Sequence, residues 1–331
     1  MEGIDVAQGS AKKHRLSFSE VWDRYSTVLI LVLMILVFGV LEPRAFLGGN
    51  NLIKIVEQSA ITILLACGEF FAILLAGIDL SISSTMALTG VVTAKLLVAG
   101  VQPFLAVLLG AILLGAAIGA VNGGLINVTG LPPFIITLGT QAILRGLTMT
   151  VSSARAVSGI PVAFTKAMGG KLWGVIPTPI LVALLTALVL TFFTKKTQAG
   201  RNLYAIGGNA QSAWFAGINV KRHTLLAFII AGVCAGLAGM VNIARLGAAE
   251  PNAGTGYETF AIAAAIIGGT SFFGGVGVVP KVVVGGLIIG VINNGLNMVG
   301  VSSYYQQIAM GALIIIAVTL DRFFGASRKR G

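Results

Sequence analysis

The sequence predicts an all-α polytopic membrane protein with about ten transmembrane helices in two weakly similar, inverted halves. Three observations support this fold class. The 331 residues are 56% hydrophobic and only 10% charged, whereas about a quarter of a typical soluble domain is charged. Mean hydropathy is +0.96, and many apolar stretches reach the roughly 18 residues that a membrane-crossing helix needs. A faint internal repeat also relates the two halves of the chain.

Hydropathy places the apolar spans one after another, with short connections between most of them. The expected spans are 25–41, 56–76, 78–99, 103–128, 132–151, 175–194, 224–246, 258–275, 279–299 and 304–324. They define a transmembrane domain over 25–324, between an N-terminal tail (1–24) and a basic C-terminal tail (325–331). No small-residue cleavage site follows the first span, so we expect it to act as an uncleaved insertion signal. The second and third spans touch near 77–80, which indicates either two helices with almost no loop or one broken, re-entrant helix.

The Lys and Arg residues indicate the orientation of the spans. With both termini cytoplasmic, most of them fall in inward-facing segments, above all the tails and the long 195–223 loop: Lys12, Lys13, Arg15, Arg24, Lys195, Lys196, Arg201, Lys221, Arg222, Lys281, Arg322, Arg328, Lys329 and Arg330. The positive-inside rule favours this orientation, with the largest outer loop at about 152–174. Topology therefore explains the net charge of +11, and no nucleic-acid partner is expected.

The internal repeat has an offset of 171 residues. It pairs "GAVNGGLINVTGLPPFI" with "GVINNGLNMVGVSSYYQ", so that Gly119 matches Gly290 and Asn122 matches Asn293. In the predicted topology the first copy runs inward and the second outward. Inverted repeats are common in transport proteins, which place the pathway between the two halves. The repeat therefore favours a transporter over a structural membrane protein.

Two acidic residues lie in or beside apolar spans, where charged groups are costly. Glu69 is either a pathway or proton-relay group or a structural carboxyl bonded to a neighbouring helix, and the sequence leaves both open. Asp79 begins the stretch Asp-Leu-Ser-Ile-Ser before an apolar run. We expect Asp79 or Ser81 to cap the next helix, because free amides and the positive end of the helix dipole gather there.

Amide side chains inside the spans are the candidates for a substrate pathway. These candidates are Asn122, Gln141, Asn293, Asn294 and Asn297. Amides both donate and accept hydrogen bonds, which suits hydroxyl-rich ligands such as sugars. Hydrogen bonding between helices is the alternative role. Arg145, four residues after Gln141 and on the same helical face, is expected to reach water or the outer headgroup region.

Catalytic and metal-binding patterns are missing from the sequence. It has no HExxH, no GxSxG and no paired carboxylates, so no catalytic residue, metal ligand or bound cofactor is expected. Gly207-Gly208-Asn209 lacks the strand and the Lys-Ser/Thr of a phosphate loop, so the chain itself is not expected to bind ATP. Small residues spaced three and four apart over Ala231–Gly239 predict close helix packing.

The 195–223 loop interrupts the apolar spans with a small-residue segment between two basic ends. Within it "NAQSAWFAGINV" predicts one short helix, capped by Asn209 and ended by Gly217. A helix this short is not stable alone. It must therefore be held by a neighbour. That neighbour is its own membrane domain, the lipid interface, which Trp214 and Phe215 would contact, or a cytoplasmic partner.

Four stretches, taken in order, point to a known family: "LLAGIDLSISSTMALTG", "GRNLYAIGGNAQSAWFAGINV", "EPNAGTGYETFAIAAAIIGGTSFFGG" and "NNGLNMVGVSSYYQ". They resemble the membrane permease subunits of bacterial ABC importers for monosaccharides, the group that carries ribose, xylose, galactose and allose. The resemblance covers residues from about 25 to 324.

The resemblance implies a pore-forming, non-catalytic subunit in the inner (plasma) membrane. A second permease copy would complete the pathway, as a homodimer or a pair of related chains, and a periplasmic binding protein would deliver a pentose or hexose. A separate cytoplasmic ATPase would use Mg-ATP. By this resemblance, the short helix of the 195–223 loop is the coupling helix that docks on the ATPase, and its contact residues are Asn209, Ala210, Ala213, Gly217 and Ile218. The alternative is a secondary sugar or ion-coupled transporter that uses Glu69 and Asp79.

Overall fold

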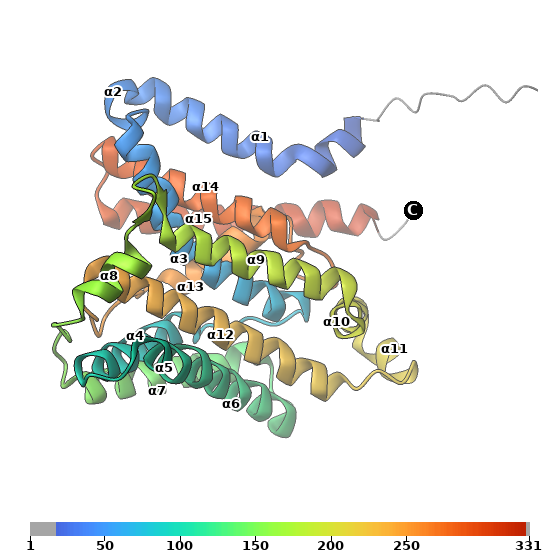
Figure 1. The fold of residues 1–331 in the computed structure, drawn as a ribbon. Coiled ribbons are helices and arrows are strands. Elements are labelled where there is room, and N and C mark those ends of the chain that lie inside the picture. Colours follow the sequence, from blue (N-terminus) through green and yellow to red (C-terminus); the bar gives the residue numbers. More distant parts are fainter. Residues whose placement is uncertain (1–17, 329–331) are drawn as a thin grey trace, which may run out of the picture.

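The computed structural model describes residues 18–328, and helices make up most of this part of the chain (Figure 1). The long helices lie side by side with their axes roughly aligned. Their connections therefore gather at two opposite ends of the bundle, one of which carries the loop between residues 196 and 220.

The helices are α1 (Phe18–Leu41), α2 (Pro43–Phe46), α3 (Gly49–Leu74), α4 (Ile82–Val98), α5 (Pro103–Val107), the π-helical segment η1 (Leu108–Leu113), α6 (Leu114–Thr129), α7 (Pro133–Ser152), α8 (Val162–Gly169), α9 (Thr178–Lys196), α10 (Gln198–Gly208), α11 (Ala210–Phe215), α12 (Val220–Leu246), α13 (Tyr257–Ile267), α14 (Val279–Met298) and α15 (Ser303–Arg328). α5, η1 and α6 are continuous and form one helix of 27 residues. Two short strands, β1 (Lys171–Leu172) and β2 (Ile176–Pro177), pair antiparallel.

Six helices of the described chain are long and apolar enough to cross a membrane: α3, the α5–η1–α6 helix, α7, α9, α12 and α14. Shorter apolar helices at Tyr25–Leu41, Ile82–Val98, Tyr257–Ile267 and Tyr304–Ile316 occupy the other predicted spans. The predicted helical, polytopic membrane architecture is therefore confirmed. The first turn of α1 and the last turn of α15 lie at the same end of the bundle as α10 and α11 (Figure 1), as an even number of crossings requires.

α3 and α12 form the core of the bundle. Every residue of α3 from Ser59 to Leu74 is buried, because α9, α12, α13 and α14 all pack against this helix. α12 in turn contacts α3, α4 and α6. Peripheral helices expose large apolar side chains instead, such as Leu185, Leu188 and Phe192 on α9. Such an apolar outer surface is suited to lipid.

Glycines allow α6 and α12 to approach each other closely. A Cβ at Gly119 would overlap the carbonyl of Phe228, and one at Gly232 would overlap the carbonyl of Gly115. The close packing predicted for Ala231–Gly239 is therefore confirmed. In lipid, where apolar burial does not drive helices together, these backbone contacts supply van der Waals attraction.

The predicted span 258–275 is helical only in its first part. α13 ends at Ile267, and its 11 residues extend roughly 16 Å at a rise of 1.5 Å per residue, about half the hydrocarbon thickness of a bilayer. Glycines with positive φ then form the irregular segment 268–278: Gly269, Gly274, Gly275 and Gly277. A helix cannot continue through residues in this conformation.

The segment predicted as an outer loop at about 152–174 has structure of its own. It contains α8 and the first strand of the β1–β2 hairpin, and a bridge between Val157 and Ala249 ties it to the connection between α12 and α13.

α6 and α14, which carry the predicted repeat, run in opposite directions (Figure 1). This is what an inverted repeat requires, and the relation between the two halves stays a prediction.

Replacing Gly119 with alanine is expected to destabilise the protein, because the new methyl group has no room beside the carbonyl of Phe228. Overpacking of this kind costs about 1–3 kcal/mol. Gly124→Ala on the same helix is the matched control, since nothing lies within 4 Å of its Cβ position. Thermal unfolding in detergent should show a lower midpoint for the first variant only, and equal midpoints would contradict the described packing.

Candidate functional site: a polar helix break and a docked loop

A break separates α3 from α4 at residues 75–81, inside an otherwise apolar sequence. Ala76 has a φ of 57°, which is uncommon for a residue other than glycine. The N–H of Gly77 donates back to the carbonyl of Ala72 (2.9 Å), and a side chain at Gly77 would press against Pro133 of α7. The ambiguity of the sequence at this point is thus resolved as two helices joined by a short irregular segment.

Side chains satisfy the backbone groups that the break frees. The hydroxyl oxygen of Thr137 on α7 accepts a hydrogen bond from the N–H of Leu80 (3.1 Å) and lies 3.0 Å from the carbonyl oxygen of Ile78. Glu69 Oε1 accepts from the N–H of Asp79 (3.1 Å). Unpaired backbone groups are costly in a membrane interior, so these contacts explain how an irregular segment persists among buried helices.

Asp79 and Ser81 organise the start of α4. Asp79 Oδ1 accepts hydrogen bonds from the N–H (3.0 Å) and the hydroxyl (2.6 Å) of Ser81. Ser81 holds the N-cap position, but its hydroxyl makes no capping bond. It accepts instead from Asn122 Nδ2 on α6 at 2.8 Å. A buried chain of polar groups therefore runs from Glu69 through Asp79 and Ser81 to Asn122.

Within residues 18–328, two oxygen atoms in this polar chain have no hydrogen-bond partner, Glu69 Oε2 and Asn122 Oδ1. Both residues are buried, with 0% and 1% of their surface exposed. A buried acceptor without a donor is unfavourable. The hydrogen-bonding groups at the break are thus less fully paired than those of a regular helix.

Gln141 and Arg145 belong to a second polar contact, between α7 and the start of α13. Gln141 Nε2 donates to Glu258 Oε1 (3.2 Å). Arg145 Nη1 donates to the carbonyls of Pro251 (2.8 Å) and Ala253 (3.2 Å). The sequence predicts a water-facing or headgroup-facing Arg145, whereas the half-buried guanidinium anchors the connection between α12 and α13.

The asparagines of α14 form a third group. Asn51 and Asn294 exchange two amide hydrogen bonds (2.9 and 3.0 Å), and Asn297 Oδ1 accepts from Gln306 Nε2 (2.8 Å). Asn293 differs, because no residue of the described chain bonds to its buried Oδ1. The candidate pathway amides are thus divided among three regions, and all except Asn293 have a side-chain partner within the protein.

No sequence pattern singles out Thr137, Glu258 or Asn51, although each supplies one of these contacts. Threonine commonly bonds to its own helix, so only the fold shows that Thr137 faces the break. Glu258 did carry a signal, since it is an acidic residue at the start of a predicted apolar span. Asn51 lies outside its predicted span, because α3 begins at Gly49 and not near residue 56.

The 195–223 loop folds into two short helices, α10 and α11, where the sequence predicts one. Thr197 Oγ1 caps α10 by accepting from the N–H of Gly200 (3.0 Å). Asn209 Oδ1 caps α11 by accepting from the N–H of Ser212 (2.8 Å). The predicted cap at Asn209 is confirmed.

Gly217 ends α11 in a Schellman motif. Its φ is 81°, its N–H donates to the carbonyl of Trp214 (2.9 Å), and the N–H of Ile218 donates to the carbonyl of Ala213 (3.0 Å). This pattern needs a residue with positive φ, which glycine adopts readily. The predicted stop at Gly217 is confirmed, while Trp214 and Phe215 stay 63% and 72% exposed.

α10 is held against the end of α3 by backbone contacts. A Cβ at Gly207 would overlap the carbonyl of Leu74 and the backbone of Gly275, and the N–H of Gly275 donates to that same carbonyl (2.9 Å). The hydroxyl of Tyr204 donates to the carbonyl of Gly277 (2.9 Å). Burial raises the pKa of Tyr204, so the phenol stays protonated at neutral pH and keeps this bond. The loop is therefore in direct contact with the helix break.

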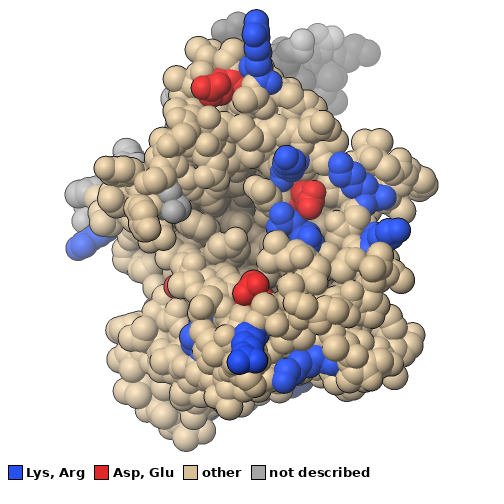
Figure 2. Space-filling model, turned by 90° about the vertical axis from the view of Figure 1, so that its left-hand side faces the viewer, with Lys and Arg blue, Asp and Glu red and all other residues tan. Residues whose placement is uncertain are grey.

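The opposite end of the bundle, near α2 and α8, presents a face that is hollowed at its centre (Figure 2). Lys and Arg side chains, with fewer Asp and Glu, stand around the hollow. An ion pair between Arg245 and Glu57 (3.2 Å) joins α12 to α3. The two ends of the bundle thus differ, one having a docked helical loop and the other a concave surface.

Long apolar helices packed in a bundle are the architecture of a multi-pass membrane protein. The family described as the permease component of the branched-chain amino acid transport system matches residues 51–318. The chain belongs to this family of ABC transport permeases, which are non-catalytic subunits and multi-pass membrane proteins.

Three relatives show how far the similarity extends. The D-allose transport system permease protein AlsC of Escherichia coli (strain K12) is 55% identical over 96% of this chain and 97% of its own length. The ribose import permease protein RbsC of Bacillus subtilis (strain 168) is 40% identical over 96% and 99%. The L-arabinose transport system permease protein AraH of Escherichia coli (strain K12) is 31% identical over 98% of both chains. No solved structure matches the chain.

Thr137→Val is expected to destabilise the protein by about 1–3 kcal/mol, because the N–H of Leu80 loses its partner inside the bundle. Thr148→Val is the matched control. Thr148 is equally buried on the same helix, and its hydroxyl bonds only within α7, to the carbonyl of Leu144. Thermal unfolding in detergent should place the Thr137 variant below the control, whereas coincident midpoints would show that Thr137 does not support the break.

Proposed function

We propose that the chain is the pore-forming permease subunit of an ATP-driven, binding-protein-dependent importer of a monosaccharide, either a pentose or a hexose. The observation that carries this proposal is the 55% identity to a D-allose permease over 96% of the chain. The ribose and L-arabinose permeases, at 40% and 31% identity, support the same substrate class. The candidate pathway groups are neutral amides, which suit polyhydroxylated ligands.

The basic residues support an orientation with both termini and α10–α11 in the cytoplasm of a bacterial inner membrane. Lys195 and Lys196 end α9, Arg201 lies in α10, and Lys221 and Arg222 begin α12, so all five lie at the end of the bundle that carries the docked loop. The hollowed face of Figure 2 then looks outward. It receives the periplasmic sugar-binding protein, and a second permease copy completes the pathway.

α11 is the coupling helix in this proposal and docks on the cytoplasmic ATPase. The docking segment comprises Asn209, Ala210, Ala213, Gly217 and Ile218. Caps at both ends hold a helix too short to persist alone. The rings of Trp214 and Phe215, with centroids 5.0 Å apart, offer the exposed aromatic anchor that protein partners commonly bury.

Movement of α11 reaches the pathway through α10. Because Gly207 contacts both Leu74 and Gly275, a displacement of α10 moves the end of α3 and the segment after α13 together. The polar break that follows α3 is the hinge in this scheme. The two halves then alternate between outward and inward openings, driven by Mg-ATP hydrolysis in the partner.

An ion-coupled secondary transporter explains less of what is observed. That alternative needs Glu69 and Asp79 as coupling groups. Glu69 Oε1 and Asp79 Oδ1 instead both accept from backbone N–H groups at the break, which gives the two carboxyl groups a structural role. Membership of an ABC permease family points to ATP as the energy source.

Purification of the tagged chain from its native membranes in mild detergent tests the proposal. We expect an ATPase to co-purify in stoichiometric amount, and the reconstituted complex to hydrolyse ATP faster when a sugar-loaded binding protein is added. A chain that purifies alone and moves sugar with a proton or sodium gradient would overturn it.

Phe215→Ala is expected to weaken assembly with the ATPase by ~2 kcal/mol, roughly a 30-fold loss of affinity, if this exposed ring is buried by the partner. Phe192→Ala is the matched control, because Phe192 is similarly exposed but lies on α9, away from the docking segment. ATPase co-purification and sugar-stimulated hydrolysis measure the effect. Equal losses in the two variants would contradict docking through α11.

Gln141→Leu is expected to raise the KM for sugar uptake about fivefold, because the variant loses one hydrogen bond worth ~1 kcal/mol. Thr150→Val, on the exposed side of the same helix, removes a hydroxyl that bonds only to the carbonyl of Gly146 and serves as control. Uptake of labelled sugar at matched expression is the measurement. An unchanged KM would remove Gln141 from the pathway.

A further inference from the structure

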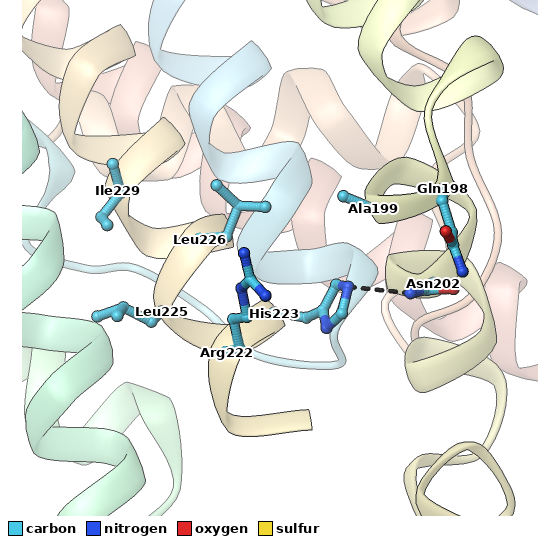
Figure 3. A pocket seen from close by; sticks show the side chains of 8 residues that line it. All are labelled: Gln198, Ala199, Asn202, Arg222, His223, Leu225, Leu226 and Ile229. Atoms are coloured by element: carbon cyan, nitrogen blue, oxygen red, sulfur yellow. Dashed lines mark hydrogen bonds between the residues drawn. The ribbon is translucent and has the colours of Figure 1, made fainter. Parts of the chain in front are cut away.

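A pocket of about 510 Å³ lies between α10 and the first turns of α12, apart from the helix break (Figure 3). Its lining consists of Gln198, Ala199, Asn202, Arg222, His223, Leu225, Leu226 and Ile229. Polar side chains from both helices meet at the start of α12, and branched apolar side chains follow further along that helix. The pocket is therefore amphipathic along the axis of α12.

The polar end of the pocket favours an anion. Arg222 lies beside His223 at the start of α12 (Figure 3), and no acidic residue is among those that line the pocket. The first turn of a long helix adds the positive end of its dipole. Lys195, Lys196 and Arg201 lie close in sequence to Gln198, so the surrounding loop is basic as well.

His223 fixes the geometry of the pocket. Its Nδ1 lies 2.7 Å from the carbonyl oxygen of Asn219, and its Nε2 lies 3.1 Å from Asn202 Nδ2. His223 thus ties α12 to α10, and Arg222 brings a guanidinium group to the lining.

The apolar part of the pocket lies further along α12 than Arg222. Leu225, Leu226 and Ile229 are roughly 8–14 Å along α12 from its first residue, at 1.5 Å per residue. All three are half-buried, so part of each remains accessible. A charged group at the helix start followed by an accessible apolar wall matches the layering of a phospholipid.

We propose that this pocket binds the headgroup of an anionic phospholipid, with its phosphate beside Arg222 and the upper part of an acyl chain along Leu225, Leu226 and Ile229. Basic pockets between transmembrane helices on the cytoplasmic side bind such headgroups. The assignment to the cytoplasmic leaflet rests on the orientation proposed above. Because the pocket joins α10 to α12, the bound lipid holds the coupling loop against the membrane domain.

Titration of the purified full-length chain with phosphatidylglycerol, phosphatidylcholine or inorganic phosphate tests the proposal. We expect native mass spectrometry to show retained phosphatidylglycerol, and thermal unfolding to shift upward with this lipid more than with phosphatidylcholine. Arg222→Gln should lower the affinity for phosphatidylglycerol about fivefold, since one basic residue contributes about that factor near an anionic surface. Lys221→Gln makes the same change of charge at an exposed neighbour outside the lining and is the control.

Leu226→Trp provides a second variant, because it fills the apolar part of the pocket without changing charge. It should also reduce the retained phosphatidylglycerol. Equal lipid binding by wild type and Arg222→Gln overturns the proposal, and equal protection by inorganic phosphate shows a soluble-anion site instead of a lipid site. If Leu226→Trp keeps the lipid but weakens ATPase co-purification, the pocket is a contact site for the ATPase and not a lipid site, and the proposal is overturned. The lipid titration needs neither sugar nor ATPase, so its failure leaves the proposed transport function standing.

Discussion

The satisfaction of backbone N–H and C=O groups in apolar surroundings is the constraint on which this structure depends. A continuous helix meets it within itself, so α3 can be buried on all sides. The break at residues 75–81 cannot meet it locally. Thr137 and Glu69 supply the bonds that the break lacks, from α7 and α3. An irregular segment therefore persists among buried helices only because its neighbours are chemically matched to it.

Close backbone contact at glycine is the second requirement, and it links the membrane domain to its loop. At Gly119 and Gly232 the absence of a side chain lets two helices touch. At Gly207 the same property lets α10 rest on the last carbonyl of α3. Packed backbones transmit displacement with little loss because protein interiors are dense. Contacts of one kind thus hold the membrane helices together and hold α10 against the end of α3.

These contacts give the polar side chains of the described residues structural roles. The described chain contains no group of three or more His, Cys, Asp and Glu residues arranged to hold a metal, and its buried carboxyl at Glu69 bonds to backbone. What it offers is a polar break, a short helix capped at both ends and a concave opposite face. The chain belongs to a family of non-catalytic permease subunits.

The sequence by itself determined the features that depend on local physics. Hydropathy located the helices, and short-range capping rules placed the cap at Asn209 and the stop at Gly217, because each involves residues only a few positions apart. Pairings across the fold were decided by tertiary structure alone. Asn51 and Asn294 are 243 residues apart, and no periodic pattern relates them. The support that Thr137 gives to the break has the same origin, since it depends on which distant backbone lies beside Thr137.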